Sequence, residues 1–267
     1  MLTRPDRSPA PGEAPGILVA RTLANSHPDL LALLRPGLDV LDVGCGPGAL
    51  TIETARRVLP GRVVGLDISG EMLAAAKRAS PPGALPNLAF REGDIREGGW
   101  DAEFDLVSAT RVLQWIPDLE RALAVMAAAT RRGGLVVARD YDHARARWLS
   151  PPAAWTRFHL AFLDWRAQGG LDNALARRLP LLLEEAAGLV EVRAIPRAVT
   201  VRAGEPDFFR VAGAWRLVAE SRGRQMTAAG ALTVVEREAA VADYAEWMGR
   251  RAAALTLHEA CVTGRRP

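Results

Sequence analysis

Short apolar runs alternate with helical periodicity through the first half of the chain. The apolar runs are predicted strands, and the stretches between them place apolar residues three and four positions apart, as on one face of a helix. The predicted strands cover residues 38–43, 62–69, 87–94, 104–109 and 133–141, and the predicted helices cover residues 17–34, 49–59, 71–79 and 118–132. This repeated alternation with short connections predicts an α/β fold with a parallel sheet and helices on both faces.

The pattern changes after Tyr141. Residues 155–166, 173–187, 207–222 and 228–254 have helical periodicity, residues 188–204 are predicted to be extended, and residues 255–267 form a closing strand. An aromatic stripe at helical spacing in the first of these helices (Trp155, Phe158, Phe162 and Trp165) is expected to be core rather than a substrate wall.

Composition excludes several classes of protein. The 267 residues are 49% hydrophobic with a net charge of +3, and no apolar run is long enough to span a bilayer. Cys45 and Cys261 cannot make a disulfide framework, and no Cys/His cluster has zinc spacing, so we expect no metal and a cytoplasmic location. The arginine pairs are expected near helix ends, where they suit the helix dipole, and a nucleic-acid partner is not expected; these pairs are Arg56-Arg57, Arg131-Arg132 and Arg177-Arg178.

A glycine-rich loop follows the first predicted strand. Gly44, Gly46 and Gly48 let the backbone approach a ligand where the next helix begins with free N–H groups. Gly44, Gly46 and Ala49 also satisfy the dinucleotide spacing G-x-G-x-x-A. However, the carboxylate of Asp42 would repel a pyrophosphate and Pro47 removes one backbone donor, so a cationic ligand without phosphate, such as S-adenosylmethionine, is favoured.

Five motifs in order resemble those of the class I, Rossmann-like S-adenosylmethionine-dependent methyltransferases. They are DVGCGPG, VVGLDIS, EGDI, FDLVSATRVLQWIPD and RRGGLVVARD, and the resemblance extends from Arg21 to Asp140. The fourth motif is similar to that of small-molecule and quinone-type methyltransferases, and the closing VTGRRP resembles the family's last strand. The resemblance implies a doubly wound, mostly parallel seven-stranded sheet with extra helices covering its carboxyl edge.

The resemblance also implies roles for individual residues. Asp67 would bind both ribose hydroxyls, Asp94 the adenine amino group and Ile95 the adenine ring, while backbone carbonyls of residues 108–111 would bind the cofactor's ammonium group. The expected cofactor-binding set is Arg21, Asp42, Gly44, Cys45, Gly46, Asp67, Ile68, Met72, Asp94, Ile95, Ala109 and Thr110. Arg21 could grip the cofactor carboxylate or be a surface arginine, and Met72 could cover adenine or belong to the core.

The expected organisation is a single methyltransferase domain over residues 17–267 after a disordered, proline-rich lead-in over residues 1–16. Residues 17–145 are the expected cofactor-binding core, 146–188 and 205–254 a helical substrate cover, and 255–267 the last strand.

The acceptor is expected to be a small, partly apolar molecule, because the covering helices carry tryptophans. Methyl transfer from a sulfonium needs alignment of the reactants, and needs a base only where the acceptor must lose a proton. Candidates for such a base are Asp140, Asp142, His143 and His159. Three alternatives remain open: a non-catalytic S-adenosylmethionine-binding module, a nicotinamide-dependent oxidoreductase, and an RNA methyltransferase.

Overall fold

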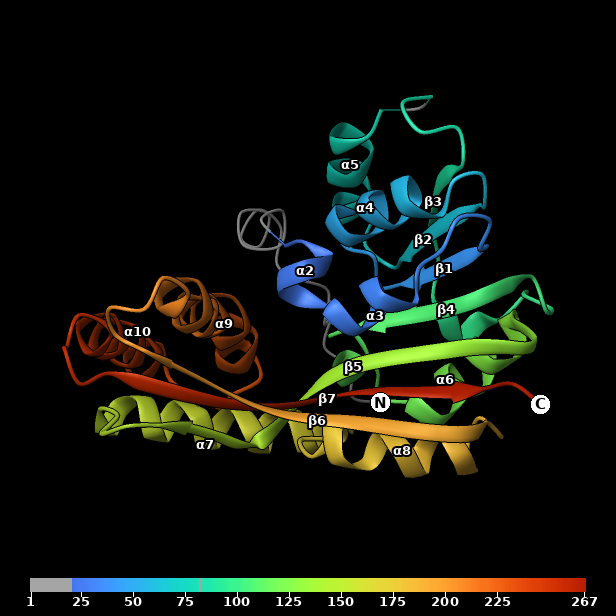
Figure 1. The fold of residues 1–267 in the computed structure, drawn as a ribbon. Coiled ribbons are helices and arrows are strands. Elements are labelled where there is room, and N and C mark those ends of the chain that lie inside the picture. The colour runs from blue at the N-terminus through green and yellow to red at the C-terminus, as the bar shows by residue number, and fades with distance from the viewer. Residues whose placement is uncertain (1–20, 82) are drawn as a thin grey trace.

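Seven strands form one sheet in the computed structural model, which describes residues 21–81 and 83–267 (Figure 1). Their order is β3-β2-β1-β4-β5-β7-β6, and β7 alone runs antiparallel to its neighbours. The strands are β1 (Val40–Val43), β2 (Val63–Asp67), β3 (Leu88–Glu92), β4 (Phe104–Thr110), β5 (Thr130–Trp148), β6 (Val190–Arg202) and β7 (Ala254–Arg265). This confirms the predicted fold class. It also puts the point where the strand order reverses between β1 and β4, at the glycine loop.

Helices cover both faces because neighbouring residues of each strand point to opposite sides. Val107 and Val136 pack in one hydrophobic cluster, whereas the adjacent Leu106 and Val137 pack in another. The first cluster contains the buried faces of α6 (Leu119–Ala129) and α8 (Leu175–Glu185), and the second contains that of α4 (Ala49–Val58). The remaining elements are α2 (Leu23–Ser26), α3 (Pro28–Leu33), α5 (Gly70–Ala79), η1 (Ile95–Glu97), η2 (Leu113–Trp115), α7 (Ala153–Gln168), α9 (Phe208–Ala228) and α10 (Val234–Met248).

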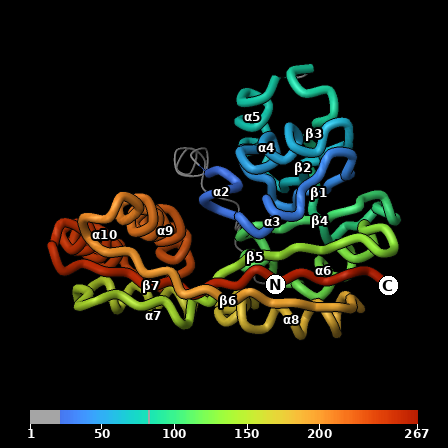
Figure 2. Tube along the Cα trace, viewed as in Figure 1, coloured from blue at the N-terminus to red at the C-terminus, as the bar shows by residue number. Residues whose placement is uncertain are grey.

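A second hydrophobic centre lies along the long strands, beyond the part of the sheet that carries the glycine loop. The ends of β5, β6 and β7 project to one side, where α7 lies on one side of them and α9 and α10 on the other (Figures 1 and 2). We call this group of three helices the aromatic lobe. Its core includes the four side chains predicted from the aromatic stripe, each at most 5% exposed, so their prediction as core is confirmed: Trp155, Phe158, Phe162 and Trp165.

The predicted helix over residues 118–132 is wrong at its end. Helix α6 stops at Ala129, where the hydroxyl of Thr130 donates to the Met126 carbonyl, and the chain continues directly into β5. Arg131 therefore starts a strand and pairs with two acidic side chains from neighbouring segments, Asp39 and Asp105, both at 2.8 Å. Tertiary ion pairs, not the helix dipole, account for this arginine.

Other boundaries also differ from the predictions. The single helix expected over residues 17–34 is, in its described part, two short helices, because Pro28 cannot donate to the preceding turn and starts α3. Arg177 and Arg178 lie in the first turn of α8 rather than near its end. The helix expected over residues 228–254 covers only Val234–Met248, and the lead-in over residues 1–16 lies outside the described residues. Within the described part of the chain, no helix has the length and apolar character to cross a membrane.

Candidate active site

The glycine loop between β1 and α4 has the backbone that its sequence predicts. Gly44, Gly46 and Gly48 all have positive φ, at +69°, +54° and +80°. A Cβ on Gly44 would lie 2.2 Å from the Val112 side chain, whereas nothing lies within 4 Å of a Cβ built on Gly46. Gly44 is thus required by packing, and Gly46 leaves bare backbone facing open space.

Asp67 at the end of β2 lies against this loop. Its two carboxylate oxygens accept the backbone N–H of Gly46 at 2.7 Å and that of Ser69 at 2.9 Å. Burial raises the pKa of Asp67 above its usual value despite these hydrogen bonds. Each oxygen keeps a further lone pair, so the carboxylate has the capacity to accept two hydroxyl groups.

Asp42 differs from the expectation of an open acidic rim. It is 5% exposed, and its oxygens accept the hydroxyls of Thr51 at 2.6 Å and Ser108 at 3.0 Å. Burial raises its pKa to about 6. Asp42 therefore connects β1 to α4 and β4 through hydrogen bonds, and its buried carboxylate borders the cavity beside the loop.

One continuous cavity of about 1860 Å³ opens over the loop. That exceeds the roughly 300–1,000 Å³ of a usual ligand pocket, so the cavity has room for a nucleoside cofactor and a second molecule. Of the expected cofactor-binding residues, those that line it are Arg21, Asp42, Gly44, Cys45, Gly46, Asp67, Ile68, Met72, Asp94, Ile95 and Thr110. Ala109 does not line it, because it is fully buried between Val43 and Ala138 of the neighbouring strands.

The residues expected around adenine lie together at one end of this cavity. The Asp94 carboxylate accepts the backbone N–H of Arg96 at 2.9 Å and also forms an ion pair with the Arg96 guanidinium, which lowers the pKa of Asp94. Ile95 and Met72 are 4% and 5% exposed and both border the cavity. Met72 is thus a core residue and a cavity residue at once.

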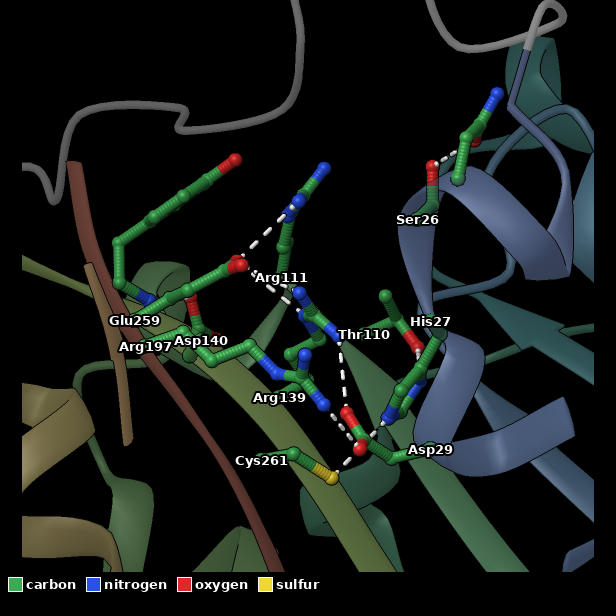
Figure 3. A network of polar contacts seen from close by, with 12 residues as sticks. Ser26, His27, Asp29, Thr110, Arg111, Arg139, Asp140, Arg197, Glu259 and Cys261 are labelled. Carbon is green, nitrogen blue, oxygen red and sulfur yellow. Dashed lines mark hydrogen bonds and ion pairs between the residues drawn. The ribbon is translucent and has the colours of Figure 1, made fainter. Parts of the chain in front are cut away.

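Several guanidinium groups lie near the carboxyl end of β4, beside the middle of β5. The Glu259 carboxylate lies between Arg139 and Arg111, and Asp29 lies between Arg139 and Arg197 (Figure 3). Sequence reasoning used residues 108–111 only for their backbone carbonyls and so missed the side chain of Arg111. A single sequence carries no signal for it, because its partner Glu259 is 148 positions away.

The four candidate bases lie in or against β5, and only two of them line the cavity. Asp142 and His143 border it, whereas Asp140 and His159 do not. Asp140 is fully buried and accepts the backbone N–H groups of Gln114 at 3.1 Å and Tyr141 at 3.0 Å, and burial raises its pKa to about 7.

The two histidines are held as neutral rings. His143 contacts the Gln114 side-chain oxygen through Nε2, and burial lowers its pKa well below the usual value. His159 packs against the rings of Trp148 and Trp215, with centroids 4.7 and 5.6 Å away, and burial lowers its pKa to about 4. Asp142 pairs with Arg177 at 3.1 Å. These four side chains therefore lie in different surroundings and do not converge on one point.

Four aromatic side chains form one wall of the cavity. It consists of Trp115 from η2, Phe162 and Trp165 from α7, and Trp215 from α9. Phe162 packs edge-on against Trp115 and Trp215, with centroids 6.5 and 5.8 Å apart. Phe162 and Trp165, half of the predicted aromatic stripe, thus belong to the hydrophobic core of the aromatic lobe and also line the cavity.

Comparisons with known proteins agree with this geometry. Residues 40–134 match the family described as "Methyltransferase domain". Trans-aconitate 2-methyltransferase from Deinococcus radiodurans is 37% identical over 191 residues, which are 61% of this chain and 71% of that protein. The chain belongs to the class I S-adenosylmethionine-dependent methyltransferases.

Further likenesses are consistent with this family. Trans-aconitate 2-methyltransferase from an Azoarcus species is 36% identical over 133 residues, and the chain spans about half its length (51%). The YcgJ protein from Bacillus subtilis has the same fold, with a TM-score of 0.59, 15% identity, and coverage of 91% of this chain and 98% of that one.

The family settles two of the predictions. The methyltransferase uses S-adenosylmethionine and acts on small molecules, which confirms the predicted enzyme class and cofactor and contradicts the nicotinamide alternative. The bare backbone at Gly46 and the carboxylate of Asp67 suit a nucleoside whose ribose needs two acceptors and whose sulfonium carries no phosphate.

Proposed function

We propose that this methyltransferase transfers a methyl group to a carboxylate oxygen of a small, partly apolar acid. The observation that carries the proposal is the opposite charge of two parts of one cavity. Asp67 and Asp94 border the part of the cavity at the glycine loop, whereas Arg21 and Arg111 border another part, where Glu259 pairs with Arg111. Arg210 also lines the cavity, but Asp207 pairs with it. A cationic cofactor suits the first part, and an anionic acceptor suits the second.

The aromatic wall supports the apolar part of the acceptor. Trp115, Phe162 and Trp215 line the same cavity as Arg21 and Arg111. An acid that buries an apolar group against these rings would remove hydrocarbon from water while its carboxylate stays near the guanidinium groups. The names of both trans-aconitate 2-methyltransferases indicate an organic acid as their acceptor, which supports a carboxylate here.

Binding and alignment are the chief tasks of this chain's residues. We propose that Asp67 holds the ribose, Asp94 and Ile95 the adenine, and the Gly44–Gly46 backbone the amino-acid part of the cofactor. When bound, the cofactor would supply an activated methyl group on its sulfonium. A carboxylate oxygen in line with the carbon–sulfur bond would form the new bond to the methyl carbon, and the electron pair of the broken bond would go to sulfur. A carboxylate has no proton to lose near pH 7, so Asp140, Asp142, His143 and His159 need not act as bases.

The test is methylation of a panel of acceptors by the purified protein. The panel contains trans-aconitate, arylalkanoic acids and aliphatic acids, each beside its amide and its alcohol. We expect methyl esters from one or more acids, measured by mass spectrometry together with S-adenosylhomocysteine, and no product from the amides. Asp67→Ala serves as the cofactor-site control. Methylation of alcohols or amides with no ester from any acid would contradict the proposal.

A further inference from the structure

Arg111 has a backbone conformation that arginine rarely adopts. Its φ is +59°, in the left-handed region, and it directly follows β4 at the edge of the cavity. The backbone is held there by a hydrogen bond from the Arg111 N–H to the Arg139 carbonyl at 2.7 Å. Strain of this kind persists where the surroundings impose it, and it gathers at binding sites. The turn aims the side chain back over the cavity instead of along the strand.

The guanidinium of Arg111 is oriented but lightly engaged. It stacks on the Tyr141 ring, 4.8 Å from the centroid, and one Nη lies 3.3 Å from a Glu259 oxygen. By contrast, Arg139 contacts Glu259 through two nitrogens and Asp29 through a third. Nε of Arg111 is buried with no hydrogen-bond partner among the described residues. Glu259 is therefore satisfied chiefly by Arg139, and Arg111 keeps donors for a ligand.

A second guanidinium, that of Arg21, lies near this side chain. Burial and the neighbouring guanidinium of Arg111 lower the pKa of Arg21 to about 10, so the two cations lie close enough to repel each other. Arg21 has no hydrogen bond or ion pair within the described residues. Both side chains are half-buried and border the cavity, and within the described part of the chain the one ion pair between them and a carboxylate is the 3.3 Å contact of Arg111 with Glu259, so a ligand carboxylate would find donors on both guanidinium groups.

We propose that Arg111 is the residue that selects a carboxylate on the acceptor; this rests on the proposed function. Two carboxylates enter this cavity during the reaction, one on the cofactor's methionine part and one on the acceptor. Arg111 binds the carboxylate of the acceptor. Tyr141 and Glu259 orient its planar guanidinium, which can donate two parallel hydrogen bonds to a carboxylate. Such a fork discriminates an acid from its amide, since the amide would present an N–H to a donor.

The experiment replaces Arg111 by residues that suit its backbone. Arg111→Gly removes the guanidinium and relieves the left-handed conformation, and Arg111→Lys keeps the charge without the fork. Ala102→Gly is the matched control, because Ala102 also has positive φ, at +49°, and does not line the cavity. Each protein is saturated with S-adenosylhomocysteine and titrated by calorimetry with the acids of the panel, trans-aconitate included. The dissociation constant of S-adenosylhomocysteine is measured separately.

We expect Arg111→Gly to weaken binding of the acid roughly 10- to 100-fold, to remove the preference for acid over amide, and to change affinity for S-adenosylhomocysteine less than threefold. Arg111→Lys should recover part of the affinity but not the full preference. Unchanged acid binding in Arg111→Gly overturns the role of Arg111. An equal loss of S-adenosylhomocysteine affinity overturns it too, because Arg111 would then hold the cofactor.

The same titrations separate this inference from the proposed function. Acids that bind in an Arg111-dependent way but yield no methyl ester contradict the proposed reaction and leave the role of Arg111 supported. Acids that are esterified equally well by wild type and Arg111→Gly contradict only the role of Arg111. Failure of every acid to bind the wild-type complex contradicts both.

Discussion

The carboxylate of Asp67 accepts a hydrogen bond from the backbone N–H of Gly46 at 2.7 Å, joining the end of β2 to the loop that follows β1. The two segments are 21 residues apart in sequence. Two adjacent parallel strands thus supply the loop and the acid that braces it, so the carboxylate is held in place before any ligand arrives.

Replacing Asp67 tests this arrangement directly. Asp67→Ala removes the acceptor for the Gly46 N–H and the proposed ribose contact together, so we expect affinity for S-adenosylhomocysteine to fall about 10- to 100-fold, as for loss of hydrogen bonds to a charged group. Asp101→Ala, in an exposed turn, is the control. Calorimetry measures both. An unchanged affinity in Asp67→Ala would show that the ribose lies elsewhere.

Two glycines of one loop should respond differently to alanine. Gly44→Ala places a Cβ 2.2 Å from the Val112 side chain at positive φ, and we expect a loss of about 2–4 kcal/mol in the free energy of unfolding. A Cβ in Gly46→Ala meets no atom within 4 Å, so the free energy of unfolding should fall by only about 1 kcal/mol, because of the positive φ. Binding of the cofactor should nevertheless weaken strongly, because the methyl group would occupy the space beside the loop backbone.

Chemical denaturation and calorimetry separate these two effects. Val112→Gly removes the clashing atoms, so adding it to Gly44→Ala should restore part of the lost stability. Adding it to Gly46→Ala should not restore cofactor affinity. Equal loss of stability in the two single variants would contradict the distinction.

The sequence predicted the cofactor half well because its signals are local. Strand β1, the glycine loop and α4 follow one another within residues 40–58, and each is specified by neighbouring residues. The second half of β5 lacks such a signal. Residues 142–148 are rich in charge, and β7 pairs with this segment at both of its ends, at Asp142 and at Arg147 and Trp148, with an irregularity between them.

The site could be predicted only as far as its motifs reach. Asp67 and Asp94 each lie at a fixed place after a strand, so their proximity to the loop follows from the sheet. Arg111 meets Glu259 across 148 positions, and Asp29 meets Arg197 across 168. Such pairs depend on tertiary packing. Burial also changed the expected role of Asp42, which periodicity alone could not indicate.

Acid conditions should weaken the anchoring of the N-terminal helices. His27 is fully buried between α2 and α3, with Nδ1 2.8 Å from the Thr110 hydroxyl and Nε2 3.4 Å from Cys261 Sγ. Burial, with Arg139, Arg111 and Arg197 nearby, lowers its pKa to about 3. The folded state therefore binds this proton less readily than the unfolded state, in which histidine has a pKa near 6.5.

His27 therefore stabilises the folded state above about pH 6.5, and this contribution to the free energy of unfolding declines as the pH falls toward 3. The loss between pH 7.5 and 5 should be up to about 2 kcal/mol. Denaturation at these two values should show a smaller decline in His27→Gln than in wild type. Some decline should persist in the variant, since the pKa of His159 is also lowered, to about 4. The half-buried His258, changed to Gln, should alter the decline less.

The pH profile of the reaction distinguishes a carboxylate acceptor from one that needs a base. Asp140 has a pKa raised to about 7 by burial, so a reaction that used its carboxylate as base would slow tenfold per pH unit below 7. For a carboxylate acceptor, we expect kcat to stay level between pH 6 and 8.5. Asp140→Asn should then keep kcat within about threefold, while losing about 1 kcal/mol of stability because one backbone N–H, of Gln114 or Tyr141, loses its acceptor. A kcat that falls below pH 7 in wild type and is abolished in Asp140→Asn would instead make Asp140 the base.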